Sequence, residues 1–391
     1  MTSPKDDQLL PVPARLAENA VSPGERTLPA EPPAPSPTAA QVSGESLVAS
    51  WERYELLELL GRGGMGEVYK ARDRRLGRLV ALKFILGADP NRAMRFLQEA
   101  RAQARIDHPN VCKVYEAGEV AGKAFISMQL VAGQRLDQAA ADMSLPERVQ
   151  VMREVAGAVH EAHRLGVIHR DLKPSNIMVG RAEDGRLSPV VMDFGLAYET
   201  SQGHGLTESG TMMGTPAYMA PEQARGELRN IDRRSDVYSL GATLYELLTG
   251  AVPFTDPTLV GLLSKVLHEE PLPPRARVPH LESDLETIVL KCLSKEPDQR
   301  YPSARAVAED LGRYMDGDPI LGRRPSLRYR LRRYARKHRA LVTVSALSLA
   351  SILILVGWGA RSWLEARDTQ RQSETRARLA EELGQQVKEI E

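Results

Sequence analysis

Cysteine is nearly absent from this chain of 391 residues, which contains only Cys112 and Cys292. The two lie far apart and show neither CxxC nor Cys/His spacing, so the sequence predicts reduced, buried thiols rather than a disulfide framework or a zinc site. An excess of one charge is also missing, because 52 Lys and Arg against 51 Asp and Glu leave a net charge of +1. This balance gives no general attraction to nucleic acid. The N-terminus has no basic flank followed by an apolar run, so no secretory signal is predicted.

Aromatic residues are missing from residues 1–50, whereas nine prolines occur before position 40. A segment of this kind cannot bury enough apolar surface to offset the chain entropy lost on folding. We therefore predict a disordered, Pro-rich N-terminal tail at 1–50. The run PPAPSP at 32–37 also suits a polyproline II ligand for a partner protein, which is the alternative to a plain solvated tail.

The most informative motif is HRDLKPSN at 169–176, which is followed by an apolar strand and a DFG triplet beginning at Asp193. Phosphoryl transfer needs a carboxylate to receive the acceptor proton, oxygen ligands for Mg²⁺, and positive charge against the transferred phosphate. Asp171 can act as the base and Lys173 can neutralise the γ-phosphate. Asn176 and Asp193 are hard oxygen ligands for the metal ion. The stretch therefore offers all the groups that phosphoryl transfer requires.

These motifs resemble the eukaryotic-like (Hanks-type) Ser/Thr protein kinases, in the subgroup of bacterial single-pass membrane kinases. The resemblance spans residues 54–315 and implies an α+β, bilobal kinase fold, with a small β-rich N-lobe that carries one helix and a larger helical C-lobe. It implies ATP and Mg²⁺ as cofactors and proteins with Ser or Thr acceptors as substrates. Thr215 in GTPAYMAPE, together with Lys173, is the pattern of the Ser/Thr branch.

A glycine-rich stretch at 61–66 predicts a lid over the nucleotide. GxGxxG alone also occurs in dinucleotide-binding folds, but here Val68 and Tyr69 continue an alternating strand instead of opening a helix. The resemblance implies that Lys83 in VALK binds the α- and β-phosphates and pairs with Glu99 on a predicted helix at 91–105. The ATP-binding residues implied by the family pattern are Leu60, Gly61, Gly63, Gly66, Val68, Ala81, Lys83, Glu99, Met128, Gln129, Val131 and Met178.

One position departs from the family pattern. Gln103 lies four residues after Glu99, where the family usually has an apolar residue that packs toward the DFG phenylalanine. A buried amide at this position must find a partner or lose on the order of 1 to 3 kcal/mol. The departure puts in doubt how readily the active arrangement forms.

The C-lobe is predicted from two helical patterns. An amphipathic helix at 145–165 carries His160 and His163, which we expect to face solvent because no third metal ligand lies nearby. A second helix at 236–250 is apolar on nearly all sides and should be buried. The family pattern implies that Asp236 clamps the backbone of the HRD loop, and that Arg300 pairs with Glu222.

The segment after DFG is polar and Gly-rich from 197 to 214, so we expect it to be mobile unless something orders it. In the family, an arginine directly before the catalytic aspartate, as Arg170 is here, marks members in which a phosphate orders the segment after DFG, called the activation segment. We predict autophosphorylation in trans, between the two copies of a homodimer. The predicted phosphosites are Thr207, Ser209 and Thr211.

Acidic residues are absent between 319 and 364, and nine Lys or Arg residues occur at 323–339. Arg/aromatic mixtures also bind nucleic acid, but the uncharged run at 340–360 gives a better explanation, because as a helix it is about 32 Å long and a bilayer core is about 30 Å thick. A buried core helix is the alternative. We predict a basic juxtamembrane segment at 319–339 and one transmembrane helix at 340–360.

The cation bias places the kinase domain on the cytoplasmic side of the cell membrane, because only five Lys or Arg residues follow the apolar run up to Arg378. Residues 361–391 then form a helical extracytoplasmic stub, and we expect the natural chain to continue past Glu391. The predicted function is transfer of the ATP γ-phosphate to protein Ser/Thr hydroxyls, without a nucleic-acid partner. The alternatives are a catalytically inactive pseudokinase scaffold and a small-molecule phosphotransferase.

Overall fold

A computed structural model describes residues 51–63, 66–85, 90–182, 184–194, 216–323 and 339–390. Several of the predictions above fall outside these residues. They concern the N-terminal tail, Gly195 of the DFG triplet, the phosphosites Thr207, Ser209 and Thr211, Thr215, and positions 324–338 of the basic segment.

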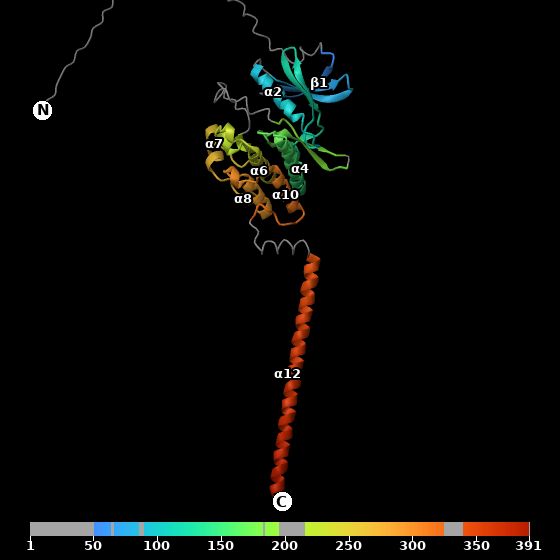
Figure 1. The fold of residues 1–391 in the computed structure, drawn as a ribbon, viewed down its shortest axis with the longest axis vertical. Helices are drawn as coiled ribbons and strands as arrows, with labels where there is room; N and C mark the ends of the chain where they lie inside the picture. The colour runs from blue at the N-terminus through green and yellow to red at the C-terminus, as the bar shows by residue number, and fades with distance from the viewer. Residues whose placement is uncertain are drawn as a thin grey trace, which may run out of the picture. The chain divides into compact units, whose positions relative to one another are not determined.

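The N-lobe is an antiparallel five-stranded sheet with one helix against it (Figure 1). The strands follow one another in the order β1-β2-β3-β5-β4. Alternate residues of β2 are buried, as expected for a strand with one face on a core. The elements are β1 (Tyr54–Gly63), β2 (Gly66–Asp73), β3 (Arg78–Ile85), α2 (Pro90–Gln103), β4 (Val114–Val120) and β5 (Lys123–Gln129).

The C-lobe is mainly helical and carries a small three-stranded sheet of order β6-β7-β8. The predicted bilobal α+β fold is therefore confirmed. The elements are β6 (Gln134–Arg135), α3 (Leu136–Ala139), α4 (Leu145–Arg164), β7 (Ile177–Arg181), β8 (Leu187–Val191), α5 (Pro221–Ala224), α6 (Arg233–Thr249), α7 (Leu259–His268), α8 (Pro274–Arg277), α9 (Ser283–Cys292) and α10 (Ala304–Met315).

Helix α4 begins where the sequence provides a capping box. Glu147 accepts hydrogen bonds from the backbone N–H and the hydroxyl of Ser144, at 2.8 and 2.6 Å. This arrangement satisfies groups that a helix start otherwise leaves unpaired. Gly166 follows the helix with φ of +77°, a conformation that glycine adopts without strain. The boundaries predicted from the sequence are therefore close to those observed.

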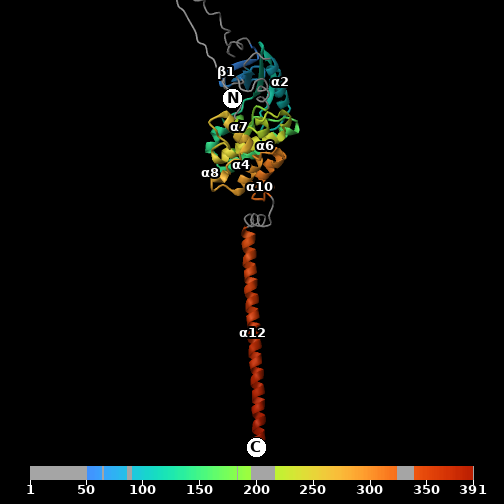
Figure 2. The same cartoon turned by 90° about the vertical axis from the view of Figure 1, so that its left-hand side faces the viewer.

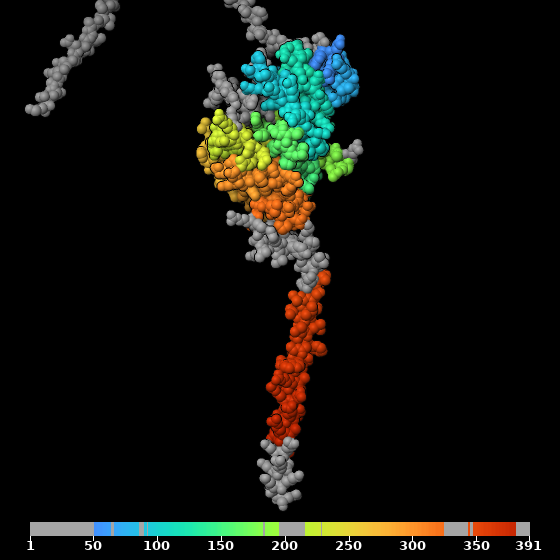
Figure 3. Space-filling model, in the orientation of Figure 1, coloured from blue at the N-terminus to red at the C-terminus, as the bar shows by residue number. Residues whose placement is uncertain are grey.

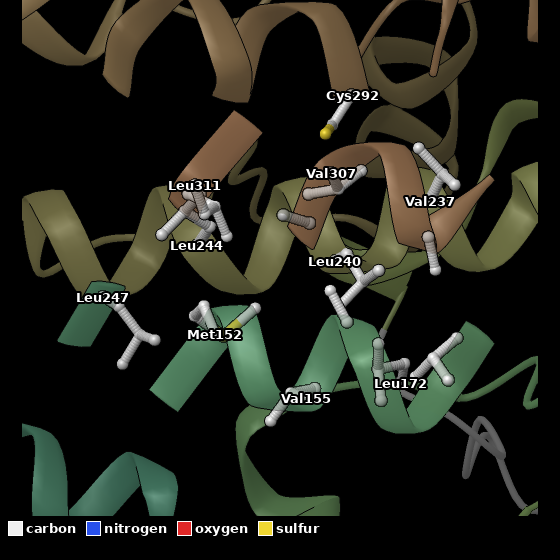
Figure 4. Close-up of a cluster of buried hydrophobic side chains, with 14 of the residues drawn as sticks. Met152, Val155, Leu172, Val237, Leu240, Leu244, Leu247, Cys292, Val307 and Leu311 are labelled. Carbon is white, nitrogen blue, oxygen red and sulfur yellow. The ribbon is translucent and has the colours of Figure 1, made fainter. Parts of the chain in front are cut away.

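Helix α6 is buried on nearly all sides, as its pattern predicts. It packs against α4, α9 and α10 in one hydrophobic core. Figure 4 shows side chains of this core from all four helices. The largely buried α6 provides a rigid support for the loop that follows α4.

Helix α12 (Arg339–Ile390) is continuous in both ribbon views (Figures 1 and 2). Its described side chains are exposed (Figure 3). Within the described part of the chain, the stretch Leu347–Ala380 is the one helical segment long and apolar enough to cross a membrane. Residues 361–390, predicted to be helical, belong to this same helix.

Candidate active site

The loop after α4 brings three of the predicted catalytic groups together. The ammonium of Lys173 lies 2.8 Å from Oδ2 of Asp171. The amide nitrogen of Asn176 donates to the same oxygen at 3.0 Å and to the backbone carbonyl of Asp171 at 2.7 Å. The carboxylate of Asp171 is therefore held from two sides, and it remains partly exposed at 20%.

A buried carboxylate on α6 holds the backbone of this loop. Asp236 on α6 accepts hydrogen bonds from the backbone N–H groups of His169 and Arg170, both at 2.8 Å. It also contacts Nε2 of His163 at 2.6 Å. Burial alone would raise the pKa of Asp236, but the hydrogen bonds from His163 and His169 hold this pKa below its ordinary value.

The expectation that His163 faces solvent is wrong. Its side chain is only 3% exposed and makes the bond to Asp236 just described. Spacing along α4 could not reveal this contact, because the partner lies 73 residues away in the sequence. His160, also expected to face solvent, is partly buried.

The DFG aspartate lies beside the nucleotide-binding lysine. Asp193 has a left-handed backbone with φ of +54°, and its Oδ1 lies 2.7 Å from the ammonium of Lys83. The next residue, Phe194, is buried against the imidazole of His169, with ring centroids 4.7 Å apart. The imidazole in turn contacts the carbonyl of Met192 through Nε2 at 2.9 Å. Through His169, the catalytic loop is thus in direct contact with the DFG segment.

The predicted adenine pocket is an apolar cluster between β2, β3 and β5. Ala81 and Met128 are buried and opposite each other in the β3/β5 register. Val68 and Val131 pack against the same cluster. Gln129 is the last residue of β5, and its backbone lies directly before the connection to the C-lobe. The structure thus brings these four side chains together near the end of β5, and their binding of adenine stays a prediction.

Other predicted ATP-binding residues are not members of this buried cluster. Leu60, Gly61 and Gly63 are exposed at the end of β1, and Met178 is half-buried on β7. Gly66 is buried, and a Cβ there would lie 1.9 Å from the carbonyl oxygen of Phe84. Glycine at position 66 is therefore needed for strand packing as well as for any approach of the backbone to phosphates.

Helix α2 carries both Glu99 and Gln103. Glu99 is half-buried, and its predicted pairing with Lys83 stays a prediction. Gln103 is 3% exposed, and its amide nitrogen donates to the carbonyl of Cys112 at 3.0 Å. The polar group that departs from the family pattern therefore has a partner, and the loss expected for an unpaired amide does not arise.

Both cysteines are reduced and buried, as predicted. The sequence did not reveal that Cys112 belongs to the same apolar cluster as Ala81 and Met128. Burial raises the pKa of the Cys112 thiol to about 12. A thiol in this state packs as a small apolar group and is a poor nucleophile.

Among the described residues, no group of three or more His, Cys, Asp or Glu side chains could hold a metal ion. The pair Asn176 and Asp193 nevertheless fits a metal that also binds phosphates. Asn176 uses its amide nitrogen toward Asp171, so its amide oxygen is the atom suited to a cation. Carboxylate and amide oxygens are the ligands that Mg²⁺ takes when phosphate oxygens and water complete its shell.

The predicted ion pair between Glu222 and Arg300 is present. Two guanidinium nitrogens of Arg300 reach the two carboxylate oxygens of Glu222 at 2.7 and 2.8 Å, and both side chains are buried. Ser235 on α6 donates to the same carboxylate at 2.7 Å. This pair attaches α5, just after the activation segment, to the helical core.

Comparison with known proteins gives a consistent result. Residues 54–311 match the protein kinase domain family. Ser/Thr-protein kinase PknB of Mycobacterium tuberculosis is 41% identical over 279 residues, which cover 68% of this chain and 44% of that protein. Ser/Thr-protein kinase pkn3 of Myxococcus xanthus is 42% identical over 271 residues, covering 66% of this chain and 49% of that protein. The chain thus spans less than half the length of these relatives.

A solved structure shows the same architecture. The PknI kinase domain of M. tuberculosis aligns with a TM-score of 0.54 and 28% sequence identity. The alignment covers 68% of this chain and 98% of that domain.

Proposed function

This chain belongs to the protein kinase family, in its eukaryotic-like (Hanks-type) Ser/Thr branch, and on that basis we propose that it transfers the γ-phosphate of ATP to serine and threonine hydroxyls of proteins. The observation that carries the proposal is the geometry around Asp171. Its carboxylate is partly exposed and is held by Lys173 and Asn176. Asp193 and Lys83, which the family pattern assigns to metal and phosphate, form an ion pair between the DFG segment and β3.

In this proposal Asp171 accepts the proton of the acceptor hydroxyl. Lys173 contacts the same carboxylate, so its charge lies where a transferred γ-phosphate would meet the base. Asn176 and Asp193 would hold Mg²⁺, which neutralises charge on the phosphate oxygens. Lys83 would bind the α- and β-phosphates. Positioning and electrostatic stabilisation account for most of catalysis in this reaction class.

The test of this function is phosphate transfer by the purified full chain in detergent. The chain is incubated with γ-labelled ATP, Mg²⁺ and a generic basic protein, and the labelled protein is hydrolysed to its amino acids. We expect phosphoserine and phosphothreonine without phosphotyrosine. Absence of transfer would favour an inactive scaffold, and phosphotyrosine would contradict the assignment to the Ser/Thr branch.

We also propose that the chain is anchored in the cell membrane by α12, with the kinase domain in the cytoplasm. Support comes from the apolar stretch of this helix and from the asymmetry of its flanks. Nine Lys or Arg residues precede the apolar run, against five after it. Cationic flanks are retained on the cytoplasmic side.

Autophosphorylation of the activation segment is a further part of the proposal. Arg170 is half-buried directly before Asp171 and has a left-handed backbone with φ of +66°. Its carbonyl accepts a hydrogen bond from the side chain of Gln223, which directly follows GTPAYMAPE. A phosphate bound by the Arg170 side chain would therefore act on both ends of the segment. We expect the transfer to occur in trans within a homodimer.

A further inference from the structure

Helix α2 carries a buried polar side chain at the end of its buried face. Among the described residues, the buried side chains of this helix are Phe96, Ala100 and Gln103. Their spacing places them on one face of the helix. Phe96 and Ala100 belong to the apolar cluster that also contains Cys112. Gln103, the last residue of α2, thus directs an amide toward the strands on which the helix packs.

The partner of this amide is a peptide group next to the DFG segment. The carbonyl of Cys112 accepts from the side chain of Gln103 at 3.0 Å. The backbone N–H of Cys112 donates to the carbonyl of Val191 at 2.9 Å. Val191 is the last residue of β8, and Asp193 follows two residues later. The side chain of Gln103 therefore connects α2 to the backbone that leads into the DFG aspartate.

Neighbouring backbone bonds extend this connection to other parts of the candidate active site. The carbonyl of Lys113 accepts from the N–H of Gln129, the last residue of β5, at 2.8 Å. The N–H of Met192 donates to the carbonyl of Asn176 at 2.9 Å. The backbone around Cys112 is thus bonded to the end of β5 and, through β8, to the catalytic loop.

We propose that Gln103 is a positioning residue for phosphate transfer. Its hydrogen bond fixes the end of α2 to the backbone that leads into Asp193, and so sets where Glu99, one turn earlier, lies relative to Lys83. The family usually has an apolar residue at this position, which packs without a preferred direction. A hydrogen bond to a buried carbonyl is directional, and loss of the donor leaves the carbonyl unpaired. The inference rests on the proposed function and names a residue that supports it.

The test compares phosphate transfer with nucleotide binding in the full chain in detergent. Transfer to a generic basic protein gives kcat, and a non-hydrolysable ATP analogue with Mg²⁺ gives the Kd. Gln103→Met keeps a side chain of similar length without a donor, and Gln103→Leu provides the residue type usual in the family. We expect both to lower kcat by at least about fivefold, as for loss of one hydrogen bond to a buried carbonyl. The Kd should change by less than about twofold, because the loss acts on the reacting arrangement.

Two control variants separate positioning from stability. Gln98→Met makes the same exchange at an exposed position of α2 and should behave as the wild type does. Val307→Ala removes buried apolar volume from the C-lobe core, so it should lower the melting temperature and leave kcat unchanged. All rates are measured at a temperature at which melting curves show every variant folded. If Gln103→Met folds poorly, Gln103→Leu keeps the test valid.

Three results would overturn the inference. The first is unchanged kcat in the folded Gln103 variants, and the second is a loss of kcat in Val307→Ala as large as theirs. The third is a loss of nucleotide affinity that accounts for the whole loss of activity. A wild type without phosphate transfer would overturn the proposed function and this inference with it, whereas an active wild type with unaffected Gln103 variants would overturn this inference alone.

Discussion

At the scale of single residues, the candidate active site depends on a few buried polar groups that are fully bonded. Asp236 is the main example, because it takes hydrogen bonds from His163, His169 and Arg170 at 2.6 to 2.8 Å. A buried carboxylate without such donors would be strongly destabilising. The position of the catalytic loop is therefore tied to the stability of α6, and substitutions at Asp236 should impair folding as well as chemistry.

Single residues also show which contacts the sequence predicts and which it does not. Motif spacing is enough to predict that Asp171, Lys173 and Asn176 lie together, because they share one short loop whose backbone forces the approach. It does not predict the partners of Gln103 or His163. Those partners are a backbone carbonyl and a carboxylate that only the tertiary fold brings near. From the sequence alone, Gln103 therefore predicts a destabilising buried amide and His163 a solvent-facing side chain, and the fold gives each a partner.

At the scale of elements, periodicity predicts helices better than it predicts their ends or their partners. Helix α6 was predicted as buried because apolar residues occur on all its faces, and the core confirms this. Its start is three residues earlier than predicted, at Arg233, because the side chain of Asp232 caps the helix by accepting from the N–H of Arg234. A cap of this kind extends a helix by using a polar residue that periodicity does not count.

The activation segment is the element for which we expect regulation. A phosphate adds about −1.5 to −2 charges and can form 1 to 3 charge-assisted hydrogen bonds. At roughly 1.5 to 3 kcal/mol each, two or three such bonds reach the ~5.5 kcal/mol that carries a 1:99 equilibrium to 99:1. Replacing Thr207, Ser209 and Thr211 together with Ala should therefore leave the kinase largely inactive on an exogenous peptide. Activity is measured after preincubation with ATP.

The control for this prediction is the wild type treated identically, with phosphosites mapped by mass spectrometry. Activity of the triple variant equal to that of the preincubated wild type would rule out the switch. We expect phosphate on Thr207 and Ser209 in the wild type, at a rate that rises with protein concentration because the reaction occurs in trans.

At the scale of the whole molecule, the folded kinase domain extends beyond the family match that ends at 311. The backbone N–H groups of Leu321 and Gly322 donate to the buried carboxylate of Asp310 at 2.7 and 2.6 Å. A Cβ at Gly322 would lie 2.2 Å from the hydroxyl of Tyr301. Sequence patterns do not predict these contacts, because they join the end of the domain to Asp310 and Tyr301, which only the tertiary fold brings near.

We predict that a fragment ending at Arg323 is soluble without detergent and retains phosphotransfer, whereas the full chain requires detergent. A fragment ending at Pro319 lacks both donors to Asp310 and should unfold at a lower temperature than the fragment ending at Arg323.

The membrane topology is tested with a phosphatase that is active only on the non-cytoplasmic side of the membrane. Fused after Glu391, this reporter should be active. Detergent-free solubility of the full chain, or a cytoplasmic reporter, would refute the membrane anchor.

The central claim is that Asp171 acts as the base and Asp193 holds the metal ion in a working protein kinase. It is tested most directly by the rate of phosphate transfer at saturating ATP, measured beside Mg²⁺-dependent nucleotide binding. Asp171→Asn should lower turnover by at least ~10², as expected for loss of a general base, with nucleotide binding nearly intact. Asp193→Asn should weaken nucleotide binding itself, and Asp184→Asn, at an exposed turn, should change neither. Wild-type turnover in Asp171→Asn would contradict the account.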